Sequence, residues 1–341
     1  MARIVLVSFR LGGTDGVAIE SAKWIAALRT LGHSVRTVAG DGVADLIIPS
    51  LAIEATMTTS MQELEEAFAN ADLVIVENLA SLPLNLDARE VLYQVLKGRP
   101  ALFHHHDLPW QRPHLAHLEG PRDEPLWRHV TINELSRGEL RERGIEAVTL
   151  MNSFDCDPAR GRRDSTRLAL DVDRRTLVLM PSRALLRKNV AGALDLCEAL
   201  GAVFWLLGPA EDGYESPLEA LIESASVEVG RGLPEGFDVN DAYAACDLVV
   251  MSSTWEGFGN PVLESVTHRR PLALHPYPVA CEIIDFGFRF FDLGDVVAIK
   301  SFLEHPNDEL YAHNLSIARE HFNIASLPTR LSELLNSMSI H

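Results

Sequence analysis

The sequence contains few cysteines and no apolar run long enough to cross a membrane. Its four cysteines are scattered, and no two have the CxxC spacing of a zinc or redox site. That distribution predicts buried thiols in a reducing compartment. The longest apolar run, residues 199–210, covers 12 residues, whereas a transmembrane helix needs about 20. Because no secretory signal is visible either, we expect a cytoplasmic protein without a transmembrane segment.

Positive charge is also scarce. Lys and Arg number 30 against 48 Asp and Glu, so the formal net charge is −18. A chain with this charge has no overall field that attracts nucleic acid, and no nucleic-acid partner is expected. Any phosphate site must therefore be local.

The length and the alternation of apolar and amphipathic segments predict an α/β protein with parallel sheets and two domains. A polar segment at residues 155–164 is typical of a linker. Pro328 is expected to divide the final helical stretch, residues 307–337, into two helices. The expected strands cover residues 3–7, 34–38, 72–76, 100–105, 129–132, 147–151, 176–180, 202–207, 226–229, 247–251, 271–274 and 289–291.

The most informative motif places two carboxylates, Glu256 and Glu264, on either side of a glycine-rich turn between a strand and a helix. Asn260 followed by Pro261 is typical of an N-cap and the first helical position. Glu264 is then expected in the first turn of the helix. Amide groups at a helix N-terminus favour an anionic or polyhydroxylated ligand.

A second strand-to-helix turn carries cations. Arg183, Arg187 and Lys188 follow the expected strand at residues 176–180, and Asn189 is expected to cap the next helix. Cations at such a turn suit a diphosphate, because they donate charge-assisted hydrogen bonds. A solvated basic turn is the alternative.

Together, Glu256-Gly-Phe-Gly-Asn-Pro-Val-Leu-Glu264 and the pair Arg183 and Lys188 resemble the signatures of retaining glycosyltransferases of the GT-B fold, family four, also called glycosyl transferases group 1. The resemblance covers nearly the whole chain. It implies two Rossmann-like domains facing each other across a cleft, with the C-terminal helix crossing back to the first. The implied divisions are residues 1–160 on the acceptor side, 161–325 for the nucleotide sugar, and 326–341 for that helix.

The resemblance also assigns residues in the first domain. Gly12 and Gly13, in a turn that lacks the G-x-G-x-x-G spacing of a dinucleotide site, match a glycine pair that contacts the donor phosphate. His106 best matches a histidine that touches the donor sugar, although His104 and His105 remain open. In a strand, His104 and His106 share one face and His105 takes the other. A histidine satisfied by a carboxylate such as Asp107 is the structural alternative, and a metal site is not expected.

The implied reaction moves a sugar from a UDP-, GDP- or ADP-sugar to an unknown acceptor with retained anomeric configuration. In the family, the residue matching Glu264 holds the ribose and the one matching Glu256 lies near the sugar hydroxyls. Amides at Phe258, Gly259 and Asn260 are expected to reach the sugar. Arg183 and Lys188 are expected to hold the diphosphate and stabilise its charge as it leaves, in a front-face mechanism that needs no metal and no cofactor.

Other readings remain open. The same fold serves epimerases and phosphorylases, but no lysine context for pyridoxal phosphate is recognisable. A nonenzymatic nucleotide-sugar-binding protein could use the same glutamates and cations without turnover. A nicotinamide oxidoreductase fits least, because the dinucleotide fingerprint is absent.

Overall fold

The computed structural model describes residues 1–13 and 15–341. Its internal contacts divide the chain into two units, Met1–Ser153 with Ile324–His341, and Phe154–Asn323. The first unit is thus built from both ends of the chain. Residues 155–164, expected as a linker, group with the second unit. In the described parts of the chain, no helix is both long enough and apolar enough to cross a membrane.

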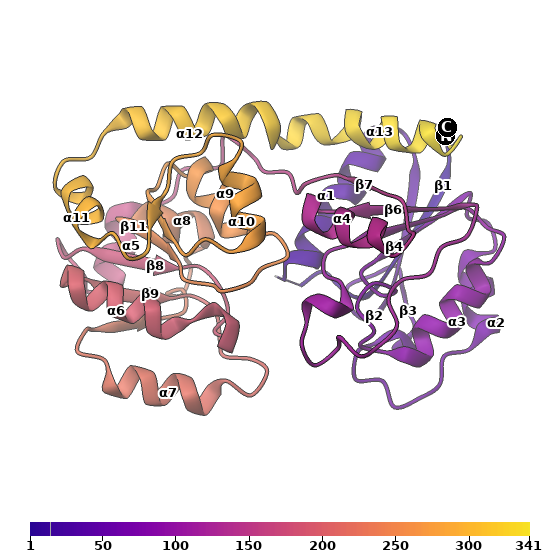
Figure 1. Ribbon diagram of the computed structural model, residues 1–341, viewed down its shortest axis with the longest axis horizontal. Coiled ribbons are helices and arrows are strands. Elements are labelled where there is room, and N and C mark those ends of the chain that lie inside the picture. Colours follow the sequence, from indigo (N-terminus) through magenta and orange to yellow (C-terminus); the bar gives the residue numbers. More distant parts are fainter. Residues whose placement is uncertain (14) are drawn as a thin grey trace. The chain divides into compact units, whose positions relative to one another are not determined.

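The first unit is built on a parallel sheet with the strand order β3-β2-β1-β4-β5-β6-β7. Figure 1 labels most of these strands. Its strands are β1 Arg3–Leu11, β2 Ser34–Gly42, β3 Leu46–Ile47, β4 Leu73–Glu77, β5 Ala101–His105, β6 Trp127–Thr131 and β7 Ala147–Thr149. Its α-helices are α1 Gly16–Thr30, α2 Met61–Phe68, α3 Leu86–Leu96, α4 Glu134–Glu142 and α13 Leu327–Ser337.

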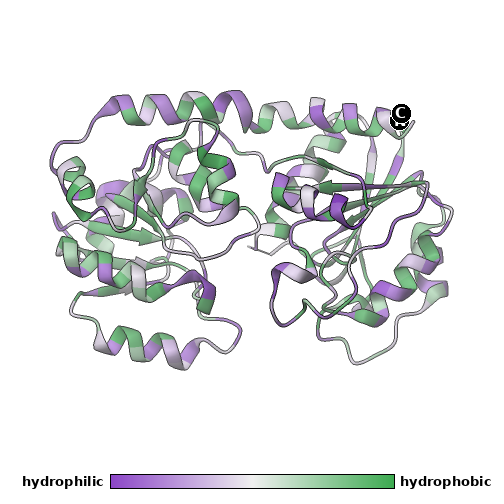
Figure 2. Ribbon diagram, viewed as in Figure 1, coloured by the Kyte–Doolittle hydropathy of each residue, from purple (hydrophilic) through white to green (hydrophobic). Residues whose placement is uncertain are grey.

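Both faces of this sheet are buried, which is why its strands are almost continuously apolar. On β1, Val5 and Val7 enter one core with residues of α2 and α3, while Ile4 and Leu6 enter another with residues of α1 and α13. This alternation follows from the two-residue repeat of a strand. Figure 2 shows the strands mainly in the hydrophobic colour.

The C-terminal helix α13 belongs to the first unit because of its leucines. Leu327, Leu331, Leu334 and Leu335 are buried in one core with Trp24 of α1. Their spacing of three and four residues places them on one face of the helix. The expected return of the last helix to the first domain is therefore confirmed.

The second unit holds a parallel sheet with the order β10-β9-β8-β11-β12-β13. Its strands are β8 Leu177–Met180, β9 Val203–Leu206, β10 Val229–Arg231, β11 Leu248–Met251, β12 Leu272–Leu274 and β13 Phe291–Asp292. Its α-helices are α5 Arg163–Ala169, α6 Val190–Leu200, α7 Glu215–Ser224, α8 Val239–Ala245, α9 Asn260–Thr267, α10 Pro278–Ile284, α11 Val296–Glu304 and α12 Asp308–His321.

The expected α/β class with two parallel sheets is confirmed, and some local expectations are wrong. The strand expected at residues 226–229 begins only at Val229. The strand at Leu46–Ile47 was missed, because two residues are too short for a periodic signal. Cys281 is exposed, although the other three cysteines are buried as expected. The final stretch does form two helices, with Pro328 in the first turn of α13.

Candidate active site

The turn after β11 carries the glycine-rich motif, and a tyrosine fixes its shape. Gly259 has a φ of 92°, in the left-handed region that favours glycine. The Tyr277 hydroxyl donates to the carbonyl oxygen of Phe258 at 2.9 Å. A Cβ on residue 259 would lie 1.9 Å from that hydroxyl oxygen. Only glycine therefore fits this turn as it stands.

Helix α9 begins differently from the sequence expectation. Gly259 occupies the N-cap, and Asn260 is the first helical residue, so the expected Asn260 cap is wrong. Glu264 consequently lies beyond the first turn, which contains no acidic residue. The physical reason is the left-handed Gly259, which starts the helix one residue earlier than a capping asparagine would.

Glu256 is the centre of a buried charged cluster. Its carboxylate contacts Lys188 Nζ at 2.5 Å and Arg187 Nη1 at 3.3 Å. Burial opposes ionisation of Glu256, but the charges of Lys188 and Arg187 outweigh it and lower the pKa of the carboxyl. Burial lowers the pKa of Lys188, and the neighbouring arginines add to that effect against the opposing carboxylate. Two cations thus face one carboxylate.

Adjacent parallel strands bring the two motifs together. β8 and β11 are neighbours, so the turns at their carboxyl ends lie at one edge of the sheet. Thr254, in the turn after β11, donates its backbone N–H to the Arg187 carbonyl at 2.9 Å, and the Ser252 hydroxyl donates to the Lys188 carbonyl at 2.8 Å. These bonds hold the cations beside Glu256.

Arg183 is placed differently from Lys188. Its guanidinium forms an ion pair with Glu211, a half-exposed partner after β9. Its backbone packs so closely against Gly208 that a Cβ there would lie 2.6 Å from Arg183 Cα. Asn189 caps α6 as expected, accepting from the Gly192 N–H at 3.3 Å.

Glu264 is held by a buried tyrosine. The Tyr243 hydroxyl donates to Glu264 Oε2 at 2.7 Å. The His268 ring stacks on Tyr243 with centroids 4.3 Å apart. The carboxylate therefore has a fixed direction before any ligand binds.

In the first unit, the glycine turn follows β1, which is longer than expected and ends at Leu11. Gly12 has a φ of 74°, and a Cβ there would lie 2.7 Å from Val43 Cβ. Gly13 does not have a φ in the left-handed region, and the nearest atom to a Cβ there would be Asp15 Oδ2, at 3.1 Å. Only Gly12 is required by this backbone.

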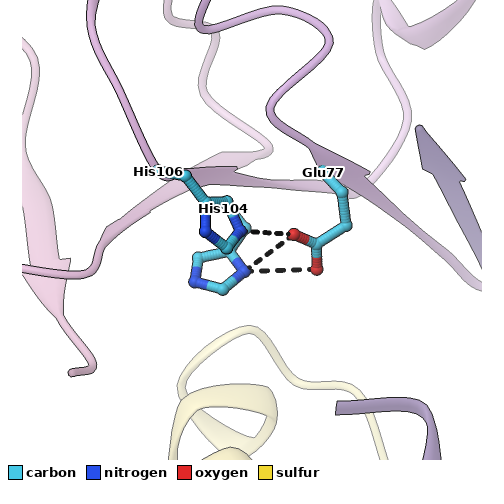
Figure 3. Close-up of side chains that lie close together, drawn as sticks. All are labelled: Glu77, His104 and His106. Atoms are coloured by element: carbon cyan, nitrogen blue, oxygen red, sulfur yellow. Dashed lines mark hydrogen bonds and ion pairs between the residues drawn. The ribbon is translucent and has the colours of Figure 1, made fainter. Parts of the chain in front are cut away.

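The histidine run divides between the two faces of the sheet, as expected. His104 Nδ1 lies 3.0 Å from Glu77 Oε2, and His106 Nε2 lies 2.9 Å from the same oxygen (Figure 3). Glu77, His104 and His106 are all buried, and within the described chain they form the only group with convergent metal-ligand atoms. The carboxylate partner of His106 is Glu77, whereas Asp107 pairs with Arg112 at 2.9 Å.

His105 takes part in a separate hydrogen-bond chain on the other face. Its Nδ1 lies 2.5 Å from Ser81 Oγ and its Nε2 lies 2.8 Å from His129 Nδ1. His129 Nε2 lies 3.2 Å from Asp123 Oδ1. If His129 Nε2–H donates to Asp123, then His105 Nε2–H can donate to His129 Nδ1, and the Ser81 hydroxyl can donate to His105 Nδ1. His105 is therefore bonded away from the Glu77 cluster.

Sequence reasoning did not single out Glu77, Tyr243 or Tyr277. Glu77 had a readable signal, since it is a charged residue at the end of an otherwise apolar strand. The tyrosines had none, because their contacts join segments separated by 19 and 21 positions.

Comparison with known proteins agrees with this geometry. Residues 164–303 match the family described as Glycosyl transferases group 1. The chain is 26% identical to mannosylglucosylglycerate synthase of Thermotoga maritima, covering 97% of this chain and 99% of that protein. It is also 26% identical to the enzyme of that name from Petrotoga mobilis, covering 85% and 86%.

Solved structures share the whole fold. HepE of Anabaena in complex with UDP-glucose has a TM-score of 0.74 at 17% identity, covering 98% of this chain and 99% of that one. Sucrose-phosphate synthase of Thermosynechococcus elongatus has a TM-score of 0.77 at 13% identity, covering 99% of both chains. These neighbours establish the GT-B fold.

The chain is therefore an enzyme, a glycosyltransferase of the GT-B fold. Its residues 164–303 match the glycosyl transferases group 1, the family that the sequence resemblance indicated.

Proposed function

We propose that this enzyme transfers a hexosyl unit from a nucleoside diphosphate sugar to an acceptor and retains the anomeric configuration. The observation that carries the proposal is the buried cluster of Lys188, Arg187 and Glu256, in which two cations share one carboxylate. A diphosphate beside this cluster would supply the missing negative charge. Its leaving would be assisted by the same cations, because they stabilise the charge that develops on it.

Specific roles follow for the second unit. Lys188 and Arg183 hold the diphosphate, and Arg183 must exchange its partner Glu211 for a phosphate oxygen to do so. Arg187 is a third contact to the diphosphate, because it lies beside Lys188 on the same carboxylate of Glu256. Glu264, aligned by Tyr243, accepts hydrogen bonds from the ribose hydroxyls. Glu256 and the amides of Phe258, Gly259 and Asn260 face the transferred sugar.

The first unit supplies the remaining contacts. Gly12 and Gly13 let the backbone approach the donor phosphate, and His106 touches the donor sugar. The nucleotide-sugar domain is assigned to residues 161–325, and the acceptor side to residues 1–160. The reaction uses a front-face mechanism in which the leaving phosphate takes the acceptor proton, so Glu256 is not a covalent nucleophile. It needs no metal, because cations of the protein neutralise the diphosphate.

The donor is the first property to test. The protein should be screened by thermal shift against UDP-, GDP- and ADP-sugars, since a ligand that binds the folded state raises stability by RT ln(1 + [L]/Kd). Sugars that raise the melting temperature are then tested for transfer to candidate acceptors, with the product anomer assigned by NMR. A stabilising nucleotide sugar whose product has the retained configuration supports the proposal. An inverted product would overturn the retaining mechanism, and no response to any nucleotide sugar would overturn the donor class.

A further inference from the structure

A glutamate and an asparagine at the end of β4 hold His106 in place. Glu77 is the last residue of β4, and its carboxylate accepts from the His106 ring at Nε2, 2.9 Å away. Asn78 accepts from the His106 backbone N–H through its side-chain oxygen at 3.1 Å. The ring and the backbone of His106 are thus fixed by consecutive residues of a neighbouring strand.

The charges around this pair favour one protonated histidine. Burial opposes a charge on His106, but the hydrogen bond and charge of Glu77 outweigh it and raise the pKa of His106. Burial lowers the pKa of His104, and a charged His106 lowers it further. The same histidines lower the pKa of Glu77 to about 2 against the effect of its burial. The Glu77 carboxylate thus stabilises one positive charge, which lies on His106 and not on His104.

Other charged groups around His106 do not replace Glu77. Glu20 of α1 is buried and adds a weaker favourable field, but its carboxylate is bonded to Lys23 at 2.9 Å. Asp107 contributes least of the neighbouring carboxylates and pairs with Arg112. On α13, the Arg330 guanidinium bonds to Ser153. Glu77 is the carboxylate that contacts the ring itself.

The three side chains also form a metal-type donor set, but their hydrogen bonding favours a proton. Both carboxylate oxygens of Glu77 lie within hydrogen-bond distance of a histidine nitrogen. A metal-bound histidine almost always donates its second N–H to a carboxylate, carbonyl or water. His104 Nε2 is buried and has no such partner among the described residues, and its ring instead stacks on Trp24 with centroids 4.1 Å apart.

We infer that Glu77 is a positioning residue that keeps His106 as an imidazolium, so that His106 Nδ1–H donates a hydrogen bond to a substrate oxygen. This inference rests on the proposed contact between His106 and the donor sugar. A neutral His106 that donated Nε2–H to Glu77 would present Nδ1 as an acceptor instead. Among the described residues, Nδ1 has no hydrogen-bond partner. Glu77 thereby sets whether this atom donates or accepts.

Protonation can be measured without any donor. Histidine labelled at Cε1 with ¹³C is incorporated into the full chain, and His106 is assigned by comparison with a His106→Gln variant. The wild-type His106 signal should titrate above the ordinary histidine pKa of 6.5, and Glu77→Gln should move that titration to lower pH. The inference is overturned if wild-type His106 titrates at or below 6.5, or if Glu77→Gln leaves its titration unchanged.

Kinetics test what the proton does. The plot of kcat/KM against pH should fall on its alkaline side as His106 loses its proton. In Glu77→Gln this fall should move to lower pH, and a shift of one pH unit lowers kcat/KM about tenfold at a fixed pH on that side. A merely structural role would lower activity equally at every pH. Asp107→Asn is the matched control, since it removes a nearby carboxylate that does not contact the ring.

The two experiments separate the inference from the proposed function. If the NMR titration shifts as expected but His106→Gln retains full activity, the proposed sugar contact is wrong while the Glu77 and His106 ion pair stands. Equilibrium dialysis against Zn²⁺ alone completes the test. Stoichiometric zinc binding that Glu77→Gln abolishes would make the cluster a metal site and overturn the positioning role.

Discussion

The Tyr277 hydroxyl occupies the space that any side chain on Gly259 would need. A Cβ at residue 259 would lie 1.9 Å from that hydroxyl oxygen, and the φ of 92° disfavours any other residue as well. Tyr277 thus determines the shape of the turn that leads from Glu256 into α9.

Gly259→Ala should therefore destabilise the protein by about 2 kcal/mol or more, through steric overlap and backbone strain. Urea unfolding measures this change. Gly201→Ala is the matched control, because Gly201 is also left-handed but has open space around its Cβ position. It should cost only about 1 kcal/mol. Adding Tyr277→Phe to Gly259→Ala should recover part of the loss, and strictly additive effects would show that the hydroxyl is not the obstacle.

Glu264→Ala should raise KM for the donor more than it lowers kcat. A ribose contact is present in both the ground state and the transition state, so its loss weakens binding uniformly. Tyr243→Phe should produce a smaller change in the same direction, since it removes only one hydrogen bond to the carboxylate. A constant KM with a hundredfold lower kcat, on the order that marks a transition-state contact, would contradict the ribose role.

Arg183→Ala and Lys188→Ala should each cost roughly 2–4 kcal/mol of transition-state stabilisation, as the loss of an oxyanion donor does. The values follow from kcat/KM of each variant. Arg187→Ala should also lower activity, because Arg187 shares Glu256 with Lys188. Arg231→Ala is the control, since Arg231 pairs with Glu219 on the exposed surface. Wild-type turnover in the Arg183 and Lys188 variants would remove both from the site.

Stability should fall as the pH is lowered from about 6.5 towards 4, in part because of His129. Burial lowers the pKa of His129 to about 4, so between these values the unfolded chain binds a proton that the folded chain does not. The difference corresponds to about 3 kcal/mol at most. Urea unfolding at pH 7 and pH 4.5 should show a smaller pH effect in His129→Asn. An equal effect in both proteins would contradict the buried neutral state.

Activity should survive EDTA and need no added divalent ion. The cations of the β8 turn neutralise the diphosphate in the proposed mechanism, so a chelator removes nothing that the reaction uses. Transfer is measured after dialysis against EDTA, with Mg²⁺ or Mn²⁺ added back as the control. Loss of turnover that either ion restores would mean that the donor is held through a metal.

The local sequence was sufficient to predict the two parallel α/β sheets and the position of most elements. Apolar strands of four to six residues, bounded by turn residues, carry a signal that does not depend on distant contacts. The family motif likewise identified Glu256, Glu264, Arg183 and Lys188 as candidates. Prediction from the local sequence failed where the pattern was short, as at Leu46–Ile47, or where one glycine moved the start of α9.

Only the tertiary structure decided how these residues are paired. Strand order brought β8 beside β11, which placed Lys188 and Arg187 on Glu256. The neighbouring β4 and β5 gave His106 the partner Glu77, 29 positions away, rather than the adjacent Asp107. The sequence determines which residues alternate across a strand, because that repeat is local. Which carboxylate meets which cation depends on strand neighbours, and those are set by packing of the whole sheet.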